Sequence, residues 1–202
     1  MSSVGGRTTA RRPAALAGSL FIVATISFAI GNSLLTEALD QGARNGKLLF
    51  GVLFQTVCAI AVVVIGVILR DLLAPTGPRQ AATYLGLRVA EGVVIVAFGL
   101  YFIISLEAFS GYQATIYAFT GVGGVVLCSL LRSAGAVPNW LSGLGLVGYL
   151  VLLAGVVTEF AGGVDLDSNA GFLFLAPGSV FEVVFPLLLI VRGLPSRRAL
   201  VG

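Results

Sequence analysis

Histidine is absent from this sequence of 202 residues, methionine occurs once and cysteine occurs twice. Without an imidazole the chain cannot bind haem or zinc through histidine, and it cannot activate a serine or cysteine nucleophile with one. These absences exclude haem-bearing bundles, most intramembrane metalloproteases and rhomboid-like serine proteases. No catalytic residue can be named, and the sequence predicts no cofactor and no metal site.

Charged residues are also scarce. They make up 10% of the chain, whereas hydrophobic residues make up 57%, and an ordinary soluble domain has about 25% charged residues. A helix that crosses a bilayer takes about 20 apolar residues, so six such helices would use about 120 residues, close to the observed hydrophobic content. The composition predicts an integral membrane protein of the all-α class, a polytopic bundle of six transmembrane helices.

Six apolar runs are long enough to cross a membrane, and charges or Pro/Gly turns bound each of them. They cover about 14–35, 48–69, 84–105, 113–131, 140–161 and 171–191. The chain 1–202 is therefore predicted to be a single transmembrane domain with tails 1–13 and 194–202. We interpret the first run as a span and not as a cleaved signal, because it exceeds the apolar region of a signal and no clear cleavage site follows it.

The basic residues outside the spans are unevenly distributed. The loops after spans 1, 3 and 5 carry only Arg44 and Lys47. Nine others lie in the tails and the remaining loops: Arg7, Arg11, Arg12, Arg70, Arg79, Arg132, Arg192, Arg197 and Arg198. Because Lys and Arg favour the cytoplasmic side, we expect a multi-pass membrane protein with both termini in the cytoplasm. This asymmetry explains the net charge of +3, so no nucleic-acid partner is expected.

Three charged residues lie inside predicted spans, where a charge costs about 2.5–3.5 kcal/mol on insertion scales. Arg88 and Glu91 are three residues apart and can pair on one helix face, and Glu182 lies at a similar depth in the last span. We expect the third and sixth spans to pack together, so that Arg88 reaches Glu91, Glu182 or both. The excess carboxylate, with Glu182 as the better candidate, could carry a proton or bind a cation. The alternatives are a purely structural pair, or an Arg88 side chain that extends to the cytoplasmic interface.

Pro177 and Pro186 flank Glu182 in the last span. Each proline removes a helical hydrogen bond and frees the carbonyl four residues before it. Transporters often build midplane ligand sites from helices that are interrupted beside a polar residue. We interpret the two prolines as producing a kink that serves packing, and a span that is interrupted around Glu182 to build a ligand site is the alternative.

Other polar and small residues in the spans predict helix contacts. Asn32, Gln55 and Tyr101 are secondary polar positions, which we interpret as interhelical hydrogen-bonding groups. Tyr84 and Trp140 are expected to anchor span ends at the interface. The two cysteines are interpreted as free packing residues, because the topology separates them in depth. Small residues recur every four positions in two sets that suit close packing: Thr25, Ala29 and Ser33, and Thr120, Gly124 and Cys128.

Three stretches carry a family resemblance. They are Leu85-Gly86-Leu87-Arg88-Val89-Ala90-Glu91, Val137-Pro138-Asn139-Trp140-Leu141 with Gly143 and Gly145, and Phe181-Glu182 followed by Val191-Arg192-Gly193. Together they resemble the domain-of-unknown-function 4386 family of bacterial integral membrane proteins, over most of the chain. The resemblance implies a six-helix bundle with Arg88, Glu91 and Glu182 as its signature, and it implies no established activity.

Three hypotheses of function follow. In the leading one, the protein binds or passes a small molecule, a lipid or a proton at Arg88, Glu91 and Glu182, and a cavity that reaches Glu182 would favour it. In the second, the chain is an accessory or scaffold subunit that binds another membrane protein, and a solid core with a flat face of small residues would favour it. The third and least favoured is an intramembrane enzyme that uses the two carboxylates for proton transfer, with a pocket opening at headgroup depth.

Overall fold

Six α-helices make up the computed structural model, which describes residues 5–42, 44–166 and 168–194, with side chains from residue 11 onward. The helices are α1 (Gly5–Asp40), α2 (Gly46–Leu73), α3 (Pro78–Ser105), α4 (Tyr112–Ser133), α5 (Asn139–Phe160) and α6 (Phe172–Val191). Each is long and apolar enough to cross a membrane. The prediction of an all-α, six-span membrane protein is therefore confirmed. Of the predicted tails, residues 1–4 and 195–202 lie outside the described residues, and so do Arg197 and Arg198.

Helices α1 to α4 extend beyond the apolar runs, most of all at the start of α1, which begins at Gly5 and not near residue 14. An apolar run marks only the part of a helix that needs lipid, and a formed helix continues into polar flanks because each added residue gains a hydrogen bond. Local signals set other ends. The side chain of Asn45 accepts a hydrogen bond of 3.1 Å from the Leu48 amide at the start of α2, and Pro78 begins α3, where its missing N–H costs nothing.

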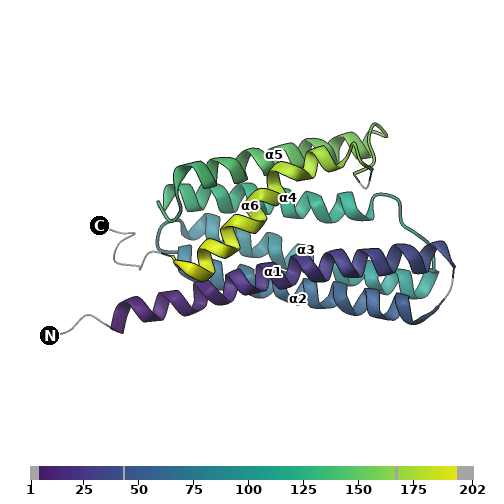
Figure 1. The fold of residues 1–202 in the computed structure, drawn as a ribbon, viewed down its shortest axis with the longest axis horizontal. Coiled ribbons are helices and arrows are strands. Elements are labelled where there is room, and N and C mark those ends of the chain that lie inside the picture. Colours follow the sequence, from purple (N-terminus) through teal and green to yellow (C-terminus); the bar gives the residue numbers. More distant parts are fainter. Residues whose placement is uncertain (1–4, 43, 167, 195–202) are drawn as a thin grey trace.

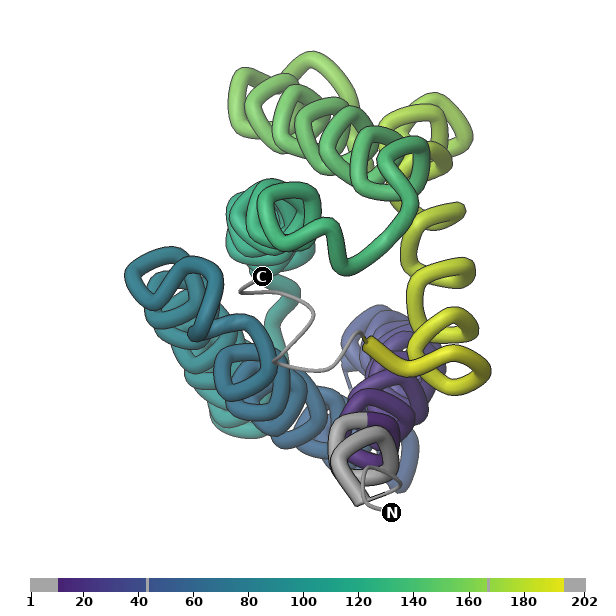
Figure 2. The backbone as a smooth tube through the Cα atoms, turned by 90° about the vertical axis from the view of Figure 1, so that its left-hand side faces the viewer, coloured from purple at the N-terminus to yellow at the C-terminus, as the bar shows by residue number. Residues whose placement is uncertain are grey.

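The helices form a ring. Each packs against the next along the chain, and α6 closes the ring against α1, as the view along the bundle shows (Figure 2). In this order α3 and α6 lie across the ring from each other and are not among the pairs that pack closely. The expectation that the third and sixth spans pack together is therefore wrong. Short loops make consecutive helices neighbours, and closing six of them into a ring places the third opposite the sixth.

Helix α1 begins and α6 ends at the same end of the bundle (Figure 1). Arg70, Arg79 and Arg132 lie in the last or first turn of their helices at this end, whereas Glu37 and Glu159 lie near the other end. The charges thus separate along the bundle axis as the sequence predicted. Which end faces the cytoplasm stays a prediction.

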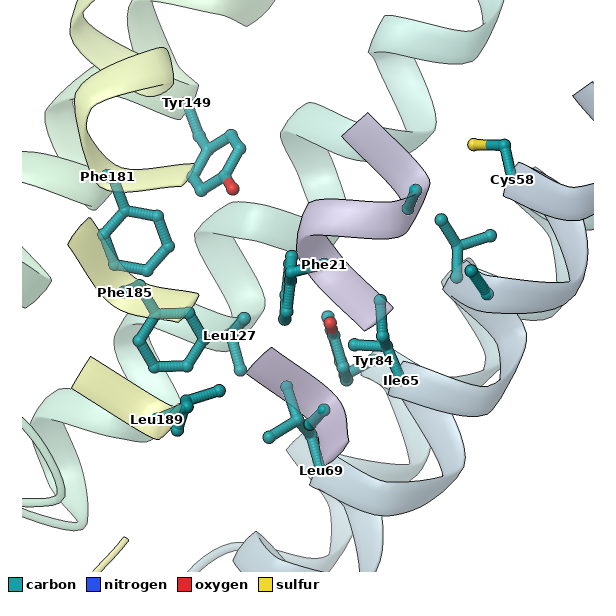
Figure 3. Close-up of a cluster of buried hydrophobic side chains, with 14 of the residues drawn as sticks. Phe21, Cys58, Ile65, Leu69, Tyr84, Leu127, Tyr149, Phe181, Phe185 and Leu189 are labelled. Atoms are coloured by element: carbon teal, nitrogen blue, oxygen red, sulfur yellow. The ribbon is translucent and has the colours of Figure 1, made fainter. Parts of the chain in front are cut away.

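Glycines bring α6 close to both of its neighbours. A Cβ at Gly148 of α5 would lie 2.6 Å from the backbone nitrogen of Gly178, and a Cβ at Gly18 of α1 would lie 2.6 Å from the carbonyl oxygen of Pro186. Aromatic rings fill the space beside these contacts (Figure 3): Phe181 and Phe185 stack at 5.0 Å, with Tyr149 beside Phe181 and Phe21 beside Phe185. Close backbone approach and ring packing hold α6 in place.

Both prolines of α6 lie inside one continuous helix, Phe172–Val191. The alternative in which this span is broken around Glu182 is therefore wrong. Tight packing on α5 and α1 holds the helix together although each proline lacks a donor. Pro186 nevertheless leaves the backbone carbonyl of Glu182 without its usual helical partner.

The two sets of small residues have different surroundings. In α4, Gly124 packs directly against the ring of Tyr149 on α5, so this set serves a contact within the bundle. In α1, Thr25, Ala29 and Ser33 are exposed and are not buried in a helix contact. The two cysteines are free and buried, which confirms their interpretation as packing residues.

Candidate functional site

A cavity of about 230 Å³ lies inside the ring and is lined by residues from all six helices. At about 30 Å³ per water molecule it has the volume of seven or eight waters. Its charged lining residues are Arg88, Glu91 and Glu182, and most of the others are apolar or aromatic. The structure therefore brings the three predicted site residues to one cavity. Their role as a ligand or proton site stays a prediction.

Arg88 and Glu91 form a buried ion pair in which Nη1 of the arginine donates to Oε2 of the glutamate at 2.6 Å. The pairing predicted from their spacing is confirmed. Arg88 is 4% exposed, so the alternative in which its side chain extends to the interface is wrong. Thr120 of α4 donates to the other oxygen of Glu91 at 2.7 Å. Both carboxylate oxygens of Glu91 thus accept a hydrogen bond. The positive charge of Arg88 and the negative charge of Glu91 balance each other.

Tyr84 supports the guanidinium group from the same helix. Nε of Arg88 donates to the Tyr84 hydroxyl at 3.1 Å, and the guanidinium carbon lies 5.2 Å from the centre of the tyrosine ring. Tyr84 is completely buried, so its interpretation as an interfacial anchor is wrong. The spacing of four residues between Tyr84 and Arg88 places them on one helix face, and this signal in the sequence could have identified the contact.

Glu182 lies across the cavity from this pair, on α6. Its Oε1 accepts a hydrogen bond of 3.2 Å from the Tyr149 hydroxyl, which points into the interior (Figure 3). Among the described residues the ion pairs are Lys47–Glu37, Arg70–Asp71 and Arg88–Glu91, and Glu182 belongs to none of them. Arg88 therefore does not bridge both carboxylates, because the ring separates α3 from α6. One arginine and two glutamates leave Glu182 as the unbalanced acid of the cavity.

The secondary polar residues do not join this cluster. Gln55 is 2% exposed, and neither atom of its amide group finds a hydrogen-bond partner in the described part of the chain. Asn32 lines a second cavity of about 470 Å³ together with Asp40 and Glu159. This cavity lies at the end of the bundle where α1 and α5 finish. Tyr101 is exposed on the outside and packs against neighbouring phenylalanines. Two hydrogen bonds to the carboxylates were not predicted from the sequence: Thr120 donates to Glu91, and Tyr149 donates to Glu182. Thr120 was expected only to serve close helix packing.

Comparison with known proteins supports the predicted family. Residues 104–193 match the family model described as Domain of unknown function (DUF4386), which confirms the resemblance over that segment. The matched residues run from the end of α3 through α6 and include Glu182. No curated protein and no solved structure matches the chain.

Proposed function

We propose that this membrane protein, whose residues 104–193 match the DUF4386 family model, binds a small molecule with a positively charged group in its central cavity. Glu182 is the counter-ion of that group. The observation that carries the proposal is the charge arrangement: Glu91 is fully engaged by Arg88 and Thr120, whereas Glu182 belongs to none of the ion pairs of the described residues and accepts one hydrogen bond, from Tyr149.

An unpaired carboxylate inside a membrane is expensive, so it marks a position where a partner of opposite charge gains most. A cation from outside would pair with Glu182 in a low-dielectric cavity, where the attraction is far stronger than in water. Aromatic side chains, including Phe21, Phe28 and Tyr117, also line the cavity. The faces of such rings attract organic cations. An organic ammonium group fits both features.

The size and lining of the cavity limit the rest of the ligand. Pockets for drug-sized ligands have volumes of about 300–1,000 Å³, and the 230 Å³ cavity is smaller. Ile65, Ile95 and Leu152 supply apolar walls, which favour an apolar body behind the charged group. A short primary alkylamine is therefore a suitable probe.

The test is binding of radiolabelled n-butylamine to the purified protein in lipid nanodiscs, measured by equilibrium dialysis. Glu182→Gln keeps the shape of the side chain and an acceptor for Tyr149 but removes the charge, so we expect the dissociation constant to rise at least tenfold. Glu37→Gln is the matched control, because Glu37 forms an exposed pair with Lys47, and it should bind as the wild type does. Equal binding by Glu182→Gln, or none by the folded wild type, would overturn the proposal.

The accessory-subunit hypothesis is the second candidate, and the exposed set Thr25, Ala29 and Ser33 on α1 favours it. Small residues spaced by four allow a helix of another protein to approach closely. Absence of butylamine binding together with a stoichiometric membrane protein that copurifies with the wild type would support it. The family resemblance implies the bacterial cytoplasmic membrane as the location, which we further propose, and the distribution of Lys and Arg favours an orientation with both termini in the cytoplasm.

A further inference from the structure

The central cavity has an opening at the side of the bundle. Three of its lining residues are exposed, namely Thr25 and Ala29 on α1 and Ser179 on α6, and the rest are buried or half-buried. We call the gap between these three residues the lateral opening. Thr25 and Ala29 lie near the middle of the span Arg11–Asp40, and Ser179 lies near the middle of Phe172–Val191. The lateral opening therefore faces the hydrocarbon core of a bilayer and not the headgroups.

The path of α6 explains why the opening lies there. At the end of the bundle where α6 finishes, α6 and α1 touch through Gly18 and Pro186 and through the rings of Phe21 and Phe185, whose centres are 5.6 Å apart. Towards its start α6 leaves α1 and packs against α5, so it crosses the bundle obliquely (Figures 1 and 2). The distance between α1 and α6 therefore increases from Phe21 towards the C-terminal end of α1.

The two hydroxyl groups at the lateral opening are already satisfied. Thr25 donates to the carbonyl of Phe21, and Ser179 donates to the carbonyl of Leu175, each one turn earlier in its own helix. Such bonds use the donor of each hydroxyl group within its own helix. An alkyl chain can lie in the opening without removing a needed hydrogen bond from either residue.

In the described part of the chain, an aromatic contact lies between the second cavity and the central cavity that holds Glu182. Along α1, Phe28 lies between Thr25 of the central cavity and Asn32 of the second cavity, and along α4, Tyr117 lies between Thr120 and Gln113 in the same way. The rings of Phe28 and Tyr117 meet with their centres 5.8 Å apart. This contact joins α1 to α4 across the ring and separates the two cavities.

We propose that the ligand enters from the membrane through the lateral opening and is a single-chain amphiphilic amine. Its ammonium group pairs with Glu182, and its alkyl tail passes between α1 and α6 into the lipid. This inference rests on the proposed function and adds the route and the ligand class. The volume of 230 Å³ is below the about 300–1,000 Å³ of pockets that enclose drug-sized ligands, so a long chain fits only if its tail leaves through the opening.

The experiment compares a ligand that fits inside with one that does not. Nanodiscs that hold the protein are loaded with radiolabelled n-butylamine, and n-dodecylamine is added as competitor at known mole fractions in the lipid. Wild type should release butylamine as dodecylamine binds. For Ala29→Phe and Ser179→Phe, which narrow the opening, the dodecylamine mole fraction at half-displacement, divided by each variant's own dissociation constant for butylamine, should rise at least tenfold over the wild-type ratio.

Matched controls place the same bulk on lipid-facing positions away from the opening. Ile26→Phe on α1 and Val183→Phe on α6 replace exposed residues that do not line the cavity, and both should behave as the wild type. If dodecylamine fails to displace butylamine from the wild type, or displaces it equally from all variants, the lateral route is wrong and the proposed function stands. If butylamine does not bind at all, the proposed function itself is wrong. If one variant fails to fold, displacement of butylamine by dodecylamine from the wild type still tests the proposal, because its absence would overturn the lateral route.

Discussion

Thr120 on α4 donates a hydrogen bond of 2.7 Å to Oε1 of Glu91 on α3 and so connects two helices at the wall of the cavity. The other oxygen of Glu91 accepts from Arg88 at 2.6 Å. Because both oxygens are engaged, Glu91 is fixed as the counter-ion of Arg88. The division of roles between the two acids follows: Glu91 completes a structural pair, and Glu182 provides the unbalanced charge.

Removal of the Thr120 hydroxyl should destabilise the bundle. Thr120→Val keeps the shape of the side chain but leaves a buried carboxylate oxygen without a donor, which costs about 1–3 kcal/mol. Thr120→Ser keeps the hydroxyl and should stay closer to the wild type. Thermal unfolding in detergent measures the difference, and equal melting temperatures for the two variants would show that the hydrogen bond contributes nothing.

Arg88→Ala should be far more damaging than Arg70→Ala. Arg88 and Glu91 are both almost fully buried, and breaking such a pair strands its partner at a cost of about 3–5 kcal/mol. Arg70 pairs with Asp71 at the surface, where both side chains are about half exposed, and exposed pairs contribute about 0–1 kcal/mol. The folded yield after size-exclusion chromatography should drop for Arg88→Ala alone. Similar yields for both variants would contradict this prediction.

Two glycines of α5 should respond in opposite directions to alanine. A Cβ at Gly148 would lie 2.6 Å from the backbone of Gly178, and because backbone cannot move aside cheaply, Gly148→Ala should destabilise by about 1–3 kcal/mol. A Cβ at Gly143 meets nothing within 4 Å, so Gly143→Ala should gain up to about 1 kcal/mol of helix propensity. Thermal unfolding of the two variants side by side tests this. A loss of stability in both would mean that contact with α6 does not decide the effect.

The sequence predicted those features that depend on local spacing or on composition. The six spans follow from the length of the apolar runs, and the pair of Arg88 and Glu91 follows from a separation of three residues in one helix. The depth of Glu182 follows from its distance to the span ends. None of these inferences requires knowledge of which helices are neighbours.

The neighbours themselves could not be predicted. Helix α5 is apolar around most of its circumference, so periodicity does not show that Tyr149 faces inward, and its hydrogen bond to Glu182 depends on how α5 and α6 are rotated. The position of α3 opposite α6 depends on the closure of the ring by α1 and α6, a contact between the first and last helices. The continuity of α6 through Pro177 and Pro186 likewise depends on packing against other helices.

Gln55 should be replaceable by an apolar residue with a gain in stability. Its amide group is buried and has no hydrogen-bond partner in the described part of the chain, and burial of such a group costs about 1–3 kcal/mol on mutational scales. Gln55→Met keeps the length of the side chain and removes this cost, so the melting temperature should rise. A fall in melting temperature would show that the amide is bonded in the membrane-embedded protein.

The orientation of the bundle can be tested by thiol labelling of intact cells. Cys58 and Cys128 are first replaced by alanine, and single cysteines are then introduced at Asn169, before α6, and at Ser133, at the end of α4. Both positions are exposed, and they lie at opposite ends of the bundle. Because the basic residues gather at the end that carries Ser133, we expect that end in the cytoplasm. A membrane-impermeant maleimide should therefore label Asn169→Cys in intact cells and label Ser133→Cys only after lysis. The reverse pattern would place the basic end outside, so the lysed sample serves as the control that both thiols can react.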